Sequence, residues 1–183
     1  MKNKYGLVLA VFLALECFHR IVMLFSNKLF FSEGILIITS IILIYKSIKN
    51  EHDNFFTIIL AIKSLFNVGF FAYVSITALS NQTYFLGSDK IFSIMLWIMN
   101  VINSLPLLLL LYMSYSKNKS EEIYRPYIPA ISKFIIMVIF IILNVYLMNN
   151  SGGTYVYELL HGAISLIIFT IEYFCMAKFI QEL

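Results

Sequence analysis

The stretch Pro126–Met148, PYIPAISKFIIMVIFIILNVYLM, decides the fold class, because Lys133 is its one charged residue. A helix needs about 20 predominantly apolar residues to cross the hydrocarbon core of a bilayer. Pro126 and Pro129 would lie in the first turn of such a helix, where a missing N–H costs little. The stretch therefore predicts a transmembrane helix.

Five other stretches are also apolar and long enough to cross a bilayer: Tyr5–Ser26, Leu29–Ile48, Asn54–Leu79, Lys90–Tyr115 and Thr154–Phe179. Together with the first stretch they fill most of the 183 residues and leave only short connections. We therefore expect an all-α, polytopic integral membrane protein, with one transmembrane domain over residues 1–183 that forms a six-helix bundle. Pro106 lies inside the fourth stretch and predicts a kink there.

The composition excludes several classes of protein. The chain is 61% hydrophobic and 13% charged, with a net charge of +3, whereas a soluble domain is about 45–50% apolar and about 25% charged. A soluble globular enzyme, a disordered chain and a nucleic-acid binder are all excluded. The expected surroundings are a lipid bilayer, most simply the cytoplasmic membrane of a bacterium.

The distribution of Lys and Arg predicts the orientation of the bundle, because cytoplasmic loops are enriched in these residues. With the N-terminus inside, only Lys28 and Lys90 flank the outer side. Both termini are therefore expected to be cytoplasmic. Eight cations lie on the inner side: Lys2, Lys4, Lys46, Lys49, Lys117, Lys119, Arg125 and Lys178.

The polar residues of each stretch fall on one side of a helix at 100° per residue, and we expect these sides to face the bundle interior. Residue counts along the helices predict two clusters at different depths. The expected ligand-binding cluster in the outer half comprises Glu16, His19, Arg20, Glu33, Glu158 and His161. The expected inner cluster comprises Lys63, Asn67, Lys133 and Glu172, with Glu172 paired to at least one lysine.

Three functions fit the outer cluster. The leading one is a non-enzymatic protein, transporter-like or a subunit of a larger membrane complex, that binds or passes an ion, a small solute or a lipid headgroup. The second is an intramembrane metal-dependent enzyme, because Glu16/His19 and Glu158/His161 are both Glu-x-x-His pairs, an arrangement that dinuclear sites in helical bundles use. It would require a divalent metal, whereas the leading reading requires no cofactor. The third is an accessory or assembly subunit whose polar interior is structural.

Ala10 and Ala14 form a small-xxx-small pair on the first helix, which is typical of close helix packing in membranes. They point away from the polar side of that helix, so we interpret them either as a docking face for a membrane partner subunit or as tight packing within the bundle. With six helices, cytoplasmic termini and this Ala-x-x-x-Ala pair, the chain resembles in architecture the substrate-binding membrane subunits of energy-coupling-factor vitamin transporters. It departs from them in its low glycine content and its very short first outer loop, and it carries no vitamin-site motif.

Overall fold

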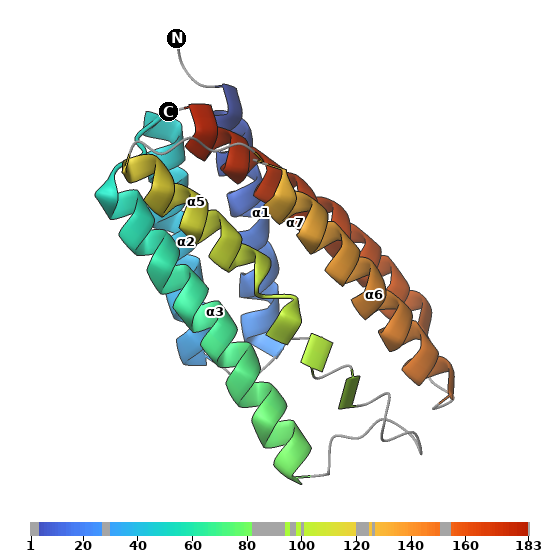
Figure 1. Cartoon of the computed structure of the whole chain (residues 1–183). Helices are drawn as coiled ribbons and strands as arrows, with labels where there is room; N and C mark the ends of the chain where they lie inside the picture. The colour runs from blue at the N-terminus through green and yellow to red at the C-terminus, as the bar shows by residue number, and fades with distance from the viewer. Residues whose placement is uncertain are drawn as a thin grey trace.

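The computed structural model describes residues 4–26, 30–81, 94–95, 98–99, 101–119, 125, 127–150 and 155–182, and of some helical residues, including Glu158 and His161, it describes only the backbone. Every regular element in this part of the chain is an α-helix, so the prediction of an all-α fold is confirmed. Figure 1 shows the six helices that these residues form: α1 (Lys4–Ser26), α2 (Phe30–Lys49), α3 (Asn54–Asn81), α5 (Pro106–Asn118), α6 (Ile128–Asn150) and α7 (Tyr155–Glu182). Five of the predicted stretches match a helix to within three residues at each end.

The fourth predicted stretch differs from its helix. In place of a kinked helix over Lys90–Tyr115, the chain makes a turn at residues 103–105 and α5 begins at Pro106. Proline lacks the N–H that a continuous helix would need and fits the first position of a new one. The turn exposes backbone carbonyls, and Lys133 Nζ of α6 donates to the carbonyl oxygen of Asn103 at 2.9 Å.

The helices form a closed ring in chain order. Each helix packs against the next, from α1 through α2, α3, α5 and α6 to α7, and α7 packs back against α1. In addition, α5 contacts α7 across the ring. The first and last helices of the chain are thus neighbours, as a site formed by the two Glu-x-x-His pairs requires.

Buried residues recur at three- and four-residue spacing, as one face of a helix requires. On α1 they are Leu9, Leu13 and Glu16, and on α3 they are Phe56, Leu60 and Lys63. The expectation that the polar sides face inward is confirmed where the structure describes them. The buried polar residues on these sides form a polar layer in the bundle: Glu16, Ser40, Lys63, Asn67, Ser104, Lys133, Ser165 and Glu172.

An apolar core lies between this polar layer and the end of the bundle where α1 begins and α7 ends. Leu9, Leu43, Phe56, Met176 and Phe179 belong to it. Both cysteines, Cys17 and Cys175, are buried and free. The apolar core packs the helices together at that end and so positions the polar layer beyond it.

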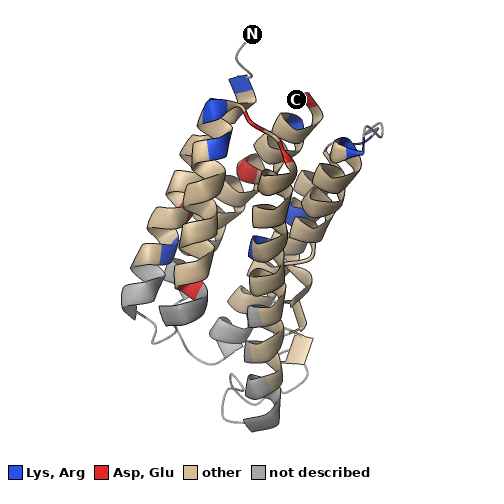
Figure 2. Ribbon diagram, turned by 90° about the vertical axis from the view of Figure 1, so that its left-hand side faces the viewer, with Lys and Arg blue, Asp and Glu red and all other residues tan. Residues whose placement is uncertain are grey.

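Charged residues also gather at the end where α1 begins and α7 ends, as Figure 2 shows. There Lys46 at the end of α2 pairs with Glu51 and Asp53. Asp53 caps α3, because its Oδ1 accepts a hydrogen bond from the Phe56 N–H at 2.8 Å, as Asp does at N-cap positions. The hydrogen bond from Lys46 is the main reason that the pKa of Asp53 lies below its ordinary value.

Two described helical segments are long and apolar enough to cross a membrane, Ile128–Tyr146 with a mean hydropathy of 2.4 and Gly162–Glu182 with 1.8. Among the others, the described apolar part of α3 is limited to Asn54–Gly69. The described part of α1 contains three charged residues, Lys4, Glu16 and Arg20, and α5 has only 13 residues because of the break before Pro106. Length and composition thus single out two helices where the sequence predicts six spans.

Candidate functional site: a buried ionic network

The centre of the polar layer is the carboxylate of Glu16 on α1, which is 2% exposed. Its Oε1 accepts a hydrogen bond from Arg20 Nε at 2.8 Å, one turn further along the same helix. Its Oε2 accepts one from Ser40 Oγ of α2 at 3.2 Å and one from Lys63 Nζ of α3. A buried charge is tolerated when it is paired and hydrogen-bonded, and both oxygens of Glu16 meet that condition.

Arg20 extends the network toward the far end of α1. Its Nη1 donates to Glu33 Oε2 of α2 at 3.0 Å, while its Nε holds Glu16. Arg20 thus bridges the two glutamates, and the exposed fractions of the Arg20 and Glu33 side chains are 12% and 14%. A guanidinium presents several donors in a fixed plane, so one arginine suits two carboxylates.

Lys63 links Glu16 to Glu172 of α7. Its Nζ donates to Glu16 and also to Ser40 Oγ at 3.0 Å. The same nitrogen lies 3.6 Å from Glu172 Oε1, which is within ion-pair distance but too long for a hydrogen bond. The prediction that Glu172 pairs with a lysine is confirmed.

Lys133 of α6 is buried but does not pair with a carboxylate within 4.0 Å among the residues that the structure describes. Its Nζ donates to both the carbonyl oxygen and Oδ1 of Asn103, each at 2.9 Å. The rings of Phe169 and Tyr173 lie 5.3 and 5.4 Å from the nitrogen, within the range of cation–π contacts. Neutral acceptors and aromatic faces therefore solvate this cation and tie α6 to the turn before α5.

The predicted division into an outer and an inner cluster is wrong, because Glu16, Lys63 and Glu172 form one continuous network. The reason is the distance of each residue, measured along its helix, from the end of the bundle where α1 begins and α7 ends. At about 1.5 Å per residue, Glu16 lies roughly 18 Å along α1, Lys63 roughly 14 Å along α3, and Glu172 roughly 15 Å from the end of α7. A lysine side chain easily spans the remaining difference.

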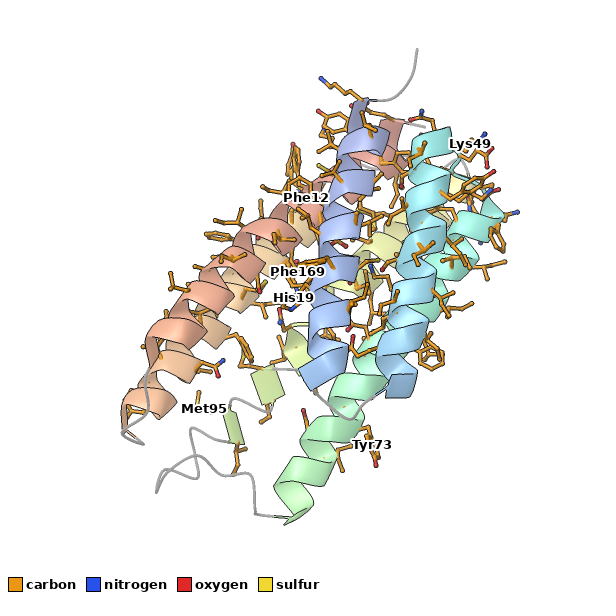
Figure 3. The ribbon with its side chains drawn as sticks, turned by 180° about the vertical axis from the view of Figure 1, so that it is seen from behind. Phe12, His19, Lys49, Tyr73, Met95 and Phe169 are labelled. Atoms are coloured by element: carbon orange, nitrogen blue, oxygen red, sulfur yellow. The ribbon has the colours of Figure 1, made fainter. Side chains whose placement is uncertain are left out.

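A small cavity adjoins the network between α1 and α7. Its volume is about 60 Å³, enough for a few water molecules. Figure 3 shows His19 and Phe169 at this place, with their ring centroids 6.3 Å apart. The lining residues are Glu16, His19, Ile164, Ser165, Ile168 and Phe169.

Two of the predicted site residues, Glu158 and His161, have side chains outside the part of the chain that the structure describes. The hypothesis of a site formed by two Glu-x-x-His pairs therefore stays a prediction. The described residues contain no group of three or more His, Cys, Asp and Glu that could hold a metal ion. Glu16, one of the four residues of the predicted metal set, has Arg20 and Lys63 in contact with its carboxylate.

The remaining predicted residues divide as follows. Asn67, one turn beyond Lys63 on α3, is buried, and its Oδ1 has no hydrogen-bond partner among the described residues. Ala10 is buried in the bundle whereas Ala14 is exposed. The two therefore do not form one exposed face, and the partner subunit that they suggest stays a prediction.

Sequence reasoning missed a hydrogen-bonded group of side chains at the end of the bundle where α1 begins and α7 ends, which we call the basic end. His52 Nε2 lies 2.8 Å from Ser114 Oγ of α5, and Ser114 Oγ lies 2.6 Å from Thr57 Oγ1 of α3. Burial, with the charge of Lys117 as the second cause, lowers the pKa of His52 from 6.5 to about 4. No periodic pattern marks these residues, because His52 lies in a connection between helices.

Comparison with known proteins adds no relative: no family model, no curated protein and no solved structure matches the chain.

Proposed function

We propose that the chain is a multi-pass membrane protein that binds or passes a small cation at the cavity beside Glu16. The six helices would cross a membrane, such as a bacterial cytoplasmic membrane, with both termini on the cytoplasmic side. The observation that carries the proposal is the contact between the cavity and a buried ionic network.

The distribution of side chains supports a lipid environment. Large apolar side chains are exposed on every helix of the described bundle. The charged side chains of the network lie between the helices. A soluble monomer rarely exposes apolar surface on this scale. Examples are Leu7 at 66%, Ile38 at 58%, Leu65 at 71%, Leu108 at 40%, Ile142 at 61% and Ile167 at 59%.

The charged side chains explain why α1 is not apolar enough by composition and could still cross a membrane. A charge at the centre of a membrane helix costs about 2.5–3.5 kcal/mol on insertion scales. In the bundle Glu16 and Arg20 compensate each other and are completed by Lys63 and Glu33. The basic residues at the end where α1 begins and α7 ends favour placing that end in the cytoplasm.

The cavity favours a cation over an anion. Glu16 is the charged residue among those that line it, and Ser165 and Phe169 add a hydroxyl group and an aromatic ring. Aromatic faces attract cations. The volume limits the ligand to a few heavy atoms, so ammonium is a suitable probe and tetraethylammonium is too large.

The test is thermal unfolding of the purified protein in lipid nanodiscs, with ammonium chloride or tetraethylammonium chloride. A ligand present at ten times its Kd stabilises the folded state by about 1.4 kcal/mol. We expect ammonium alone to raise the unfolding temperature. Ser165→Val narrows the cavity and should abolish the rise, whereas Ile167→Val, at an exposed position on the same helix, should retain it. An equal response to both salts would contradict the proposed site.

The predicted topology is tested separately. Reporter fusions at residues 50–53 and after Lys119 should report the cytoplasm, and fusions within residues 82–93 and 151–154 should report the opposite side. The reverse pattern would contradict the orientation, and extraction of the protein from membranes by alkaline carbonate would contradict the membrane assignment itself.

A further inference from the structure

Glu172 is held differently from Glu16, although both are buried carboxyl groups of one network. Glu172 is 1% exposed and lies near the middle of the apolar segment of α7. Its Oε1 is 3.6 Å from Lys63 Nζ, and its Oε2 has no hydrogen-bond partner among the described residues. Glu16, in contrast, has partners on both oxygens.

Lys63 cannot serve both carboxylates equally in this arrangement. Its ammonium group donates to Glu16 and to Ser40, and Glu172 lies beyond hydrogen-bond distance. Lys63 therefore lies between two acidic side chains and is bound more closely by Glu16 than by Glu172.

The other charged groups that face Glu172 do not complete its environment. From α1 these groups are Glu16, a second negative charge, and Arg20, which is bound to Glu16 and Glu33. From α6 the group is Lys133, whose ammonium is directed to Asn103. On α7 itself the neighbouring Tyr173 is buried, and the described part of α5 contributes no charged group to this level of the bundle.

An ionised carboxylate with an unpaired oxygen in a dry interior is strongly disfavoured, whereas a neutral carboxyl group is much less so. We propose that Glu172 carries a proton in the resting network and releases it when a cation enters the cavity beside Glu16. The inference rests on the proposed cation site and names a second ligand of the same network, the proton.

Lys63 supplies the link between the two sites. A cation in the cavity would share the charge of Glu16 and loosen the hold of Glu16 on Lys63. The ammonium group would then move toward Glu172 and stabilise its ionised form. One cation enters and one proton leaves to water, while Lys63 keeps its own proton, so the net charge of the network does not change.

The experiment is infrared spectroscopy of the full chain in nanodiscs at neutral pH, with carboxyl-labelled glutamate. We expect the carbonyl-stretch band of one protonated carboxyl group in the wild type. The band should be lost in Glu172→Gln and retained in Glu182→Gln, which changes an exposed glutamate of the same helix. Addition of ammonium chloride should remove the band from the wild type, a measurement that needs no variant to fold.

The outcomes separate this inference from the proposed function. A wild-type spectrum without the band, or a band that survives Glu172→Gln, overturns the inference. A band that persists in protein that ammonium stabilises also overturns it and leaves the cation site standing. If ammonium gives no stabilisation, the cation site is wrong, and the exchange falls with it.

Discussion

The buried pair of Lys63 and Glu16 gives the sharpest prediction about stability. In Lys63→Met the side chain keeps its approximate length and loses its charge. Glu16 is then left with Arg20 as its only cation, and Glu172 is left with no cation within 4.0 Å among the described residues. Methionine fills the space, so the change tests charge and not packing.

The expected loss follows from burial. Both side chains are 2% exposed, and removal of one partner of a buried ion pair typically costs about 3–5 kcal/mol. Since the desolvation of Lys63 is recovered when its charge is removed, we expect a net loss near the lower end, about 3 kcal/mol.

A double-mutant cycle separates the pair from its surroundings. Glu16→Gln alone should cost a similar amount, because Lys63 then loses its closest acid. The loss in the free energy of unfolding should be smaller in the double variant than the sum of the two single losses by at least about 2 kcal/mol, because the double variant leaves neither charge of the pair behind. The measurement is reversible unfolding in mixed lipid and SDS micelles.

Lys49→Met is the matched control, because Lys49 is an exposed lysine in the last turn of α2. It should change the free energy of unfolding by less than about 0.5 kcal/mol. If Lys63→Met costs no more than Lys49→Met, or if the two single losses in the cycle simply add, the reasoning about a tight buried pair is refuted.

Three further predictions concern helix contacts and the basic end of the bundle. Gly6→Ala would place a Cβ 2.5 Å from the Ser47 carbonyl oxygen and should destabilise the fold by about 1–3 kcal/mol. Gly69→Ala is the control, because its Cβ would meet nothing within 4 Å, and it should be neutral or stabilise the fold by up to about 1 kcal/mol. Equal effects of the two substitutions in thermal unfolding would contradict this prediction. Because the pKa of His52 falls from 6.5 to about 4 on folding, the unfolded chain binds the extra proton between these values. Stability should therefore fall by about 1–2 kcal/mol, after allowance for solvent screening, as the pH drops through that window, and a pH titration of His52→Gln should lack this component. Asp53→Ala should cost about 0.5–2 kcal/mol through loss of the α3 cap, and chemical denaturation with Asp53→Asn, which retains a capping oxygen, should show a clearly smaller loss.

Sequence reasoning predicts the helices well because apolar length and charge placement act locally. The bounds of five helices and the inward direction of Glu16, Lys63 and Glu172 follow from counting residues and from the 100° rotation per residue. These features depend on residues close together in the chain.

The parts that the sequence could not predict depend on relations between helices. The break before Pro106 is stabilised by Lys133, which lies on α6, so no local pattern distinguishes it from a kink. The merging of two predicted clusters depends on the relative height of α1, α3 and α7, and a difference of a few ångströms decides it. The partners of His52 lie on two other helices and carry no periodic signal.

The closed order of the helix ring has a consequence for the biogenesis of the protein. As the chain is synthesised, α1 is made first, with Glu16 and Arg20 on it and before the helices that carry Glu33 and Lys63. Ser40 and Glu33 come with α2, and Lys63 comes with α3, so the three-helix segment already contains each partner that Glu16 has among the described residues. Glu172 is delivered last, on the helix that must return to α1. The final step of assembly is therefore the docking of α7, which carries Glu172, against a network in which Glu16 and Lys63 can already pair.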